Sequence, residues 1–320
     1  MPLKVVTRAA AIVMLVSGLN FVPASALAFA SGPVATQLAS SKSKGTSILL
    51  LGDRVPTAVW GRAVRAAGAR QAGASAPAYS PWYAYAGGGA IREARCPETA
   101  LRSKQCSLGD ALSLARGGGT VMLATPGSAR HYVGNWVISA LHSSSSTLLT
   151  IRPAPGVANP TLDGNHGKAS GCQTRTCNGP VLTLLPGVHL DLDHVTVENA
   201  NNTATPLGGA IDNDSGGTIV VSTSTFLGNT ASGDGGAIDN GDGGQGTAVV
   251  SDSTFSGNSA GAPGSVDGYG GAIDNGNNNG RGALTVTGST FSGNVASNRG
   301  GAIDNGDDGG QGTAVVSDST

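Results

Sequence analysis

The chain has 320 residues, of which 51 are glycine, 12% are charged and 4% are aromatic, and its formal net charge is −1. So few charged and aromatic residues argue against a helical bundle and an ordinary globular enzyme core, and glycines without a period of three exclude collagen. The hydrophobic content of 39% is too high for a fully disordered chain.

The charges are divided unevenly along the chain. Residues 1–199 contain 17 Lys and Arg against 8 Asp and Glu, whereas residues 200–320 contain 2 Arg against 12 Asp. The acidic second part would repel the phosphates of nucleic acid, so we expect no nucleic-acid partner.

The N-terminus has the pattern of an export signal. Lys4 and Arg8 precede an apolar run over residues 9–16, and Ala-x-Ala patterns follow within residues 24–30. This order of basic, apolar and small residues is typical of a secretory signal peptide, and the apolar run is shorter than the roughly 20 residues of a membrane anchor. We therefore predict a signal peptide over residues 1–30, a secreted or cell-surface protein, and no membrane span once the signal is removed.

The segment after the signal gives no sustained periodicity. Residues 31–95 are rich in Ala, Gly and Ser, with scattered Arg. Such a composition predicts a low-complexity leader that is partly disordered.

Four cysteines follow in two local pairs. In an oxidising compartment an even number of cysteines favours disulfides, and the nearest partners are Cys96–Cys106 and Cys172–Cys177. Zinc is the competing interpretation, but the spacings differ from paired C-x₂-C sites and neither pair has a histidine beside it.

A short helix is expected at the start of the regular structure. Residues 106–116 place Leu108, Leu112 and Ala115 on one face, and Ser107 can cap the helix with Asp110 as its capping-box partner. Short strands alternate with turns after this helix, and the candidates are residues 120–123, 132–138, 147–151, 181–185 and 188–192.

Internal repetition dominates the second half of the chain. The block Gly-Gly-Ala-Ile-Asp-Asn occurs at residues 208–213, 235–240, 270–275 and 300–305. The block Ser-Thr-Phe-x-Gly-Asn occurs at residues 224–229, 253–258 and 289–294, each time after a run rich in Val and Thr. The repeating unit therefore consists of three short strands joined by turns that are rich in Gly, Asn, Asp and Ser.

Such a unit is too short to fold alone, but copies stacked about 4.8 Å apart form a solenoid. We predict an all-β, right-handed parallel β-helix over residues 96–320, a pectate-lyase-like solenoid with an N-terminal capping helix. An antiparallel sandwich or a propeller is the alternative, but the sequence shows no hairpin pattern and its repeats are shorter than typical blades. The expected core columns are Ile211, Ile238, Ile273 and Ile303, and Phe226, Phe255 and Phe291. The expected hydrogen-bonded ladder at one corner is Asn229, Asn258 and Asn294.

The two repeated blocks resemble the repeats of the chlamydial polymorphic outer membrane proteins, in which GGAI is followed by FxxN. The segment Cys106–Leu112 is similar to the CSLREA motif near the start of exported bacterial β-helix proteins, although Gly109 and Asp110 stand where that motif has Arg and Glu. Together these resemblances cover residues 106–320. They imply a surface-exposed β-helix associated with adhesion.

The aspartates of the repeat offer little chemistry by themselves. If the Ile side chains point inward, the alternation of a strand points the following Asp outward, so we expect a solvating face formed by Asp212, Asp239, Asp274 and Asp304. Calcium is a weaker interpretation, because turn-forming Asp and Asn explain the same loops. Its candidate ligands are Asp239, Asp242, Asp304 and Asp307. We predict no catalytic or cofactor-binding residue.

An extracellular polysaccharide lyase or glycoside hydrolase is the alternative function. Its site would lie in the less repetitive coils over residues 120–200, where the only candidates are Asp163, Lys168, Asp191 and Asp193. His189 and His194 lie in or beside strand-like runs and are expected to be structural, and His131, His142 and His166 belong to no recognised motif.

The leading prediction is a binding protein without catalysis. Coils that repeat the same residue types suit an adhesin-like protein with an extracellular glycan or a matrix or cell-surface protein as its partner. The oligomeric state stays open. We also expect the chain to be a fragment, because its last repeat stops at Thr320, before the core Phe.

Overall fold

A computed structural model of the chain describes residues 81–88, 96–98, 105–116, 118–139, 147–174, 176–205, 207–213, 215–241, 243–261, 267–306 and 309–320. The expected signal peptide and most of the expected leader lie outside the described residues.

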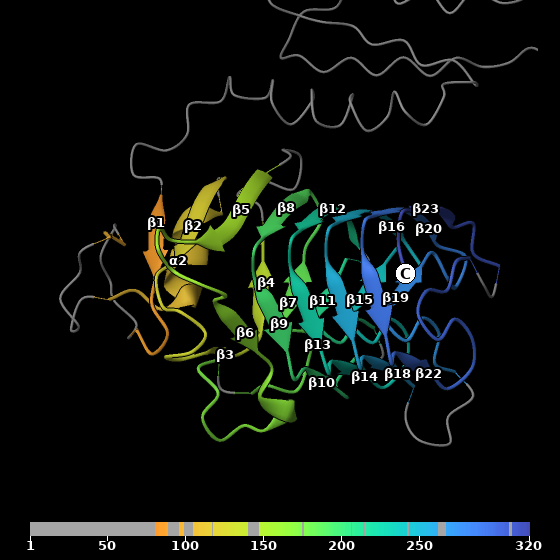
Figure 1. Ribbon diagram of the computed structural model, residues 1–320, viewed down its shortest axis with the longest axis horizontal. Coiled ribbons are helices and arrows are strands. Elements are labelled where there is room, and N and C mark those ends of the chain that lie inside the picture. The colour runs from red at the N-terminus through yellow and green to blue at the C-terminus, as the bar shows by residue number, and fades with distance from the viewer. Residues whose placement is uncertain are drawn as a thin grey trace, which may run out of the picture. The chain divides into compact units, whose positions relative to one another are not determined.

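The described chain is a parallel β-helix with four sheets (Figure 1). Sheet 1 consists of β1 (Trp82–Ala84), β2 (Gly119–Leu123), β5 (Thr147–Pro153), β8 (Val188–Asp193), β12 (Ser215–Ser222), β16 (Gln245–Ser251), β20 (Arg281–Thr287) and β23 (Thr313–Ser317). Sheet 2 consists of β3 (Tyr132–Val133), β6 (Thr161–Asp163), β9 (Thr196–Glu198), β13 (Thr225–Leu227), β17 (Thr254–Ser256) and β21 (Thr290–Ser292). Sheet 3 consists of β10 (Asn201–Asn202), β14 (Thr230–Ala231), β18 (Ser259–Ala260) and β22 (Val295–Ala296). Sheet 4 consists of β4 (Trp136–Ile138), β7 (Leu182–Leu184), β11 (Ile211–Asp212), β15 (Ile238–Asn240) and β19 (Ile273–Asn275).

Each regular coil passes through sheets 4, 1, 2 and 3 in that order. The coil of β15, β16, β17 and β18 is an example, and each of its strands pairs in parallel with the same strand of the next coil. The prediction of three strands per coil is therefore wrong by one. The additional strand of each coil has two residues, as in β14 and β18, and is too short to produce an alternating pattern in the sequence.

The β-helix begins earlier in the chain than the sequence predicted. Strand β1 pairs with β2 in sheet 1, with Trp82 opposite Val121, so part of the expected leader belongs to the solenoid. The expected helix is α2 (Leu108–Ala115), which packs against β1, β2 and β4. Its capping box is formed as predicted: the Ser107 side chain accepts from the Asp110 backbone N–H, and the Asp110 side chain accepts from the Ser107 backbone N–H. Among the described residues, no helix combines the length and apolar character needed to span a membrane.

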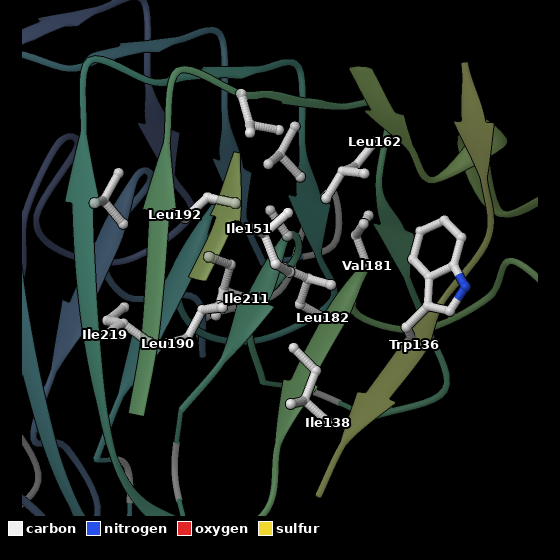
Figure 2. Packing of buried hydrophobic residues seen from close by; sticks show 14 of the residues in the cluster. Trp136, Ile138, Ile151, Leu162, Val181, Leu182, Leu190, Leu192, Ile211 and Ile219 are labelled. Carbon is white, nitrogen blue, oxygen red and sulfur yellow. The ribbon is translucent and has the colours of Figure 1, made fainter. Parts of the chain in front are cut away.

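Alternating side chains fill the core between the sheets. In β8 the buried residues are Val188, Leu190 and Leu192, while the residues between them are partly exposed. Between the sheets, large aliphatic side chains such as Ile151, Leu182 and Ile211 gather in the core (Figure 2). The Ile and Phe columns are confirmed in register: Ile211, Ile238 and Ile273 are paired neighbours, and the rings of Phe226, Phe255 and Phe291 stack with centroids 4.7 and 4.9 Å apart.

Two asparagine ladders hold the corners of successive coils together. The expected ladder is present: the Asn229 side-chain amide donates to the side-chain oxygen of Asn258 at 3.0 Å, and that of Asn258 donates to Asn294 at 2.9 Å. A second ladder, which was not predicted from the sequence, uses the last residue of each Gly-Gly-Ala-Ile-Asp-Asn block. Its side-chain bonds of 2.7, 2.7 and 2.6 Å link Asn213, Asn240, Asn275 and Asn305. Because these amides are largely buried, they satisfy backbone groups that water cannot reach.

Tyr132 adds a polar anchor to the Phe column. It pairs with Leu162 in sheet 2 and is fully buried. Its hydroxyl donates to the Ala84 carbonyl at 2.8 Å and accepts from the Thr125 backbone N–H at 3.0 Å. Burial raises the pKa of Tyr132 to about 12, although the hydrogen bonds around Thr125 oppose this shift.

We expect Tyr132→Phe to lower the free energy of unfolding by about 1–3 kcal/mol at neutral pH, because two buried backbone groups lose their partner.

The free energy of unfolding of the wild type should also fall at alkaline pH. Above the ordinary tyrosine pKa of 10.0 the unfolded chain releases the proton that the folded chain keeps until about pH 12. The contribution of the neutral Tyr132 side chain to the free energy of unfolding is thus complete below pH 10 and falls by about 3 kcal/mol toward pH 12. Urea unfolding of both proteins below pH 10 and near pH 12 measures this difference, and an equal alkaline loss in the variant would contradict it.

Candidate functional site

A groove runs along sheet 3 and crosses four successive coils. Its volume is about 390 Å³, and its lining residues come from β10, β14, β18, β22 and the turns that follow these strands. The outward positions of the four strands are in register, one per coil: Asn201, Thr230, Ser259 and Val295. The groove therefore presents equivalent positions at the spacing of the coils, about 4.8 Å.

Small inward residues explain why this face is concave. Ala231 and Ala260 are buried beneath the groove, and a strand of two residues brings the chain quickly to the next corner. The remaining lining residues are small and uncharged: Thr203, Ser232, Gly261 and Ser297. The groove thus offers hydroxyl groups and apolar atoms but no ionised group, so it suits shape complementarity and hydrogen bonding rather than proton transfer.

The prediction of an outward, solvating row of aspartates is wrong. Asp239 and Asp274 are fully buried, and Asp212 and Asp304 are partly buried. Every residue of 233–240 is buried, as is every residue of 268–277. Alternation does not decide exposure here, because the turns that flank these three-residue strands are buried as well.

The calcium hypothesis remains a prediction. Of its four candidate ligands the structure places Asp239 and Asp304, whereas Asp242 and Asp307 lie outside the described residues.

The four candidates for a carbohydrate-active site do not meet in one place. Asp191 and Asp193 lie on β8 of sheet 1, whereas Asp163 lies on β6 of sheet 2 and Lys168 is exposed after the 3₁₀ turn η3 (Asn165–Gly167). Burial is the main cause that raises the pKa of the Asp191 carboxyl, and the Asp193 charge adds to it while Arg152 opposes it.

The two expected structural histidines lie in and after β8. Burial lowers the pKa of His189. His194 lies at the corner after β8, is exposed, and forms a hydrogen bond with Asp193 through Nδ1. Neither residue lines the groove.

The structure brings Asp163 together with two residues that the sequence analysis did not select, His131 and Glu198. The Nδ1 atom of His131 lies 3.0 Å from Asp163 Oδ2 and 3.3 Å from Glu198 Oε1. Asp163 and Glu198 are register partners on β6 and β9. A signal for this pair exists in the sequence, because Thr161-Leu162-Asp163 and Thr196-Val197-Glu198 share the pattern of the later Thr-Phe-x strands.

Both expected cysteine pairs are disulfides in the structure, Cys96–Cys106 and Cys172–Cys177. The Cys96–Cys106 disulfide joins the segment before α2 to the residue just before the helix begins. The carbonyls of both cysteines accept backbone hydrogen bonds from β1 and its end, from the N–H groups of Tyr83 and Tyr85 respectively. This disulfide therefore fixes the chain that pairs with the first strand.

Comparison with known protein families finds a match in the repeated coils. Residues 223–241, 252–276 and 288–306 match the Chlamydia polymorphic membrane protein repeat, which confirms the resemblance of the repeated blocks. No curated protein and no solved structure matches the chain. The similarity of residues 106–112 to the CSLREA motif stays a prediction. The chain is thus a parallel β-helix whose coils are similar to the repeat of Chlamydia polymorphic membrane proteins.

Proposed function

We propose that this protein is an adhesin-like binding protein of the cell surface, which holds an extended extracellular partner without cleaving it. The groove along sheet 3 carries the proposal. It repeats nearly equivalent positions over four coils, so a linear glycan or an extended protein segment can make the same weak contact several times. Contacts that form within one complex add through their high effective concentration.

The chemistry of the repeated coils supports binding rather than catalysis. Residues 208–320 contain no His, Lys, Glu or Cys, four of the residue types that often act as acids, bases or nucleophiles. A catalytic site also needs different residue types that converge at one coil, whereas these coils repeat one set. Similarity to a membrane-protein repeat of Chlamydia supports a location at the cell surface.

A binding array paired with a degradation screen tests this proposal. The full chain is applied to immobilised extracellular glycans and matrix proteins, and the same polysaccharides are incubated with it and examined for shorter products. We expect saturable binding to at least one extended polymer and no shortening of it. Cleavage of a bound polymer would contradict the proposal, and so would an array on which the folded protein binds nothing.

A further inference from the structure

His131, Asp163 and Glu198 form a cluster on the outer face of sheet 2, and none of the three lines the groove. We propose that this cluster is a binding site for a divalent transition-metal ion of the zinc class. The inference is independent of the proposed adhesive function, because no residue of the cluster lines the groove.

The distances within the cluster fit shared coordination. The ligand atoms of the three residues lie within 4.8 Å of one another, and His131 Nδ1 is 3.0 and 3.3 Å from the two carboxylate oxygens. Two ligands bound to zinc at about 2.1 Å in tetrahedral geometry lie about 3.4 Å apart. The two histidine–carboxylate separations are therefore close to those of a metal site, and a side-chain adjustment of the carboxylates would complete it.

The fold positions the two carboxylates before any ion binds. Asp163 follows the buried Leu162 and Glu198 follows the buried Val197, so both side chains point outward from paired strands. Asp163 is held further by the backbone N–H of Asn165, which donates to its Oδ1 at 2.7 Å. The turn η3 is fixed over the same corner, since Gly164 and His166 donate backbone hydrogen bonds to the carbonyls of Glu198 and Asn199.

Partial burial increases the attraction of the cluster for a cation. The side chains of Asp163 and Glu198 are only 15% and 16% exposed, although both lie on an outer face. Burial is the main cause that raises the pKa of Glu198; the nearby His131 lowers it, the Asp163 charge raises it and His166 lowers it. One imidazole N–H cannot donate along a straight line to both carboxylates at once, whereas a metal ion bonds to all three groups.

The donor set selects the class of metal. Imidazole nitrogen favours zinc and its neighbours in the first transition row, whereas calcium and magnesium prefer sites made of oxygen alone. Three protein ligands leave at least one coordination position for water or for a group from a bound partner.

The test is zinc titration of the full chain, purified without a histidine tag and stripped with a chelator, in a calorimeter. We expect one zinc ion per chain at this site, and a weakening of zinc affinity by at least about tenfold in His131→Ala and in the isosteric Glu198→Gln, since loss of an outer-shell contact alone costs that much. Zinc X-ray absorption of the wild type should show one imidazole ligand. Calcium titrated in parallel should give no heat that depends on His131.

The matched control is His194→Ala. Its histidine also contacts an aspartate, Asp193, but among the described residues this pair has no third ligand. The His194→Ala substitution should leave the zinc affinity unchanged. Far-ultraviolet circular dichroism checks that each variant is folded. The proposal is overturned if zinc gives no heat, if His131→Ala and Glu198→Gln bind zinc like the wild type, or if His194→Ala abolishes binding.

Discussion

Gly236→Ala should destabilise the protein by about 3 kcal/mol or more, because the second glycine of the repeated block has no room for a side chain. A Cβ atom at this position would lie 2.1 Å from the Gly271 carbonyl oxygen and 2.6 Å from the backbone N and C of Ser259. These are backbone atoms, so whole coils must separate to relieve the clash, which places the cost at or above the upper end of ordinary overpacking. Urea unfolding followed by far-ultraviolet circular dichroism measures the loss over all strands.

Gly257→Ala is the matched control for this prediction. Gly257 has a φ of +63° but nothing within 4 Å of its Cβ position, so the variant should lose only the left-handed preference of glycine, about 1 kcal/mol. The corresponding corner of an earlier coil already holds a non-glycine residue, Asn199, at a φ of 55°. Equal losses of unfolding free energy in the two variants would show that the close approach of the coils at Gly236 leaves room for a Cβ atom.

Asn258→Ala should lower the free energy of unfolding by at least about 3 kcal/mol. The Asn258 side chain is fully buried and accepts hydrogen bonds from the backbone N–H and side-chain amide of Asn229 at 3.1 and 3.0 Å. It donates to the Phe226 carbonyl at 3.1 Å and to the side-chain oxygen of Asn294 at 2.9 Å. The substitution leaves three buried polar groups and one partly buried polar group without this partner, and each buried loss costs about 1–3 kcal/mol. Urea unfolding measures the change.

Asn201→Ala serves as the control for the ladder. The Asn201 side chain faces the groove and makes one exposed hydrogen bond, to the His166 carbonyl, so its loss should cost no more than about 0.5 kcal/mol. A loss below about 1 kcal/mol in Asn258→Ala would mean that the ladder does not hold the coils together.

Repetition made much of the fold predictable. A position that recurs in every copy must occupy the same place in every coil, and for this reason the Phe column and the ladder of Asn229, Asn258 and Asn294 were predictable without coordinates. The same reasoning applies to the ladder that starts at Asn213, which was missed because its neighbouring Asp was interpreted as a solvated turn residue.

The features that were not predictable depend on short or irregular segments. Two-residue strands such as β14 are too short to show the alternation of apolar and polar residues by which a strand is predicted. The burial of Asp239 depends on the turns around it, not on the alternation within its strand. The cluster around His131 joins residues that lie 32 and 35 positions apart, in coils whose loops differ in length. The shared strand pattern relates Asp163 to Glu198, but only the structure shows that His131 contacts both.

The most direct test of the binding account is the affinity of a groove variant for the polymer that binds best on the array. The double variant Thr230→Arg and Ser259→Arg places two long charged side chains at adjacent, register-paired positions of the groove. The double variant Thr225→Arg and Thr254→Arg adds the same charge and bulk to sheet 2 of the same coils, at positions that are equally half-buried. The groove variant should bind the polymer at least about tenfold more weakly than the wild type, a loss of about 1.4 kcal/mol, while the sheet 2 variant should bind like the wild type. Unchanged affinity in a folded groove variant would contradict the binding account.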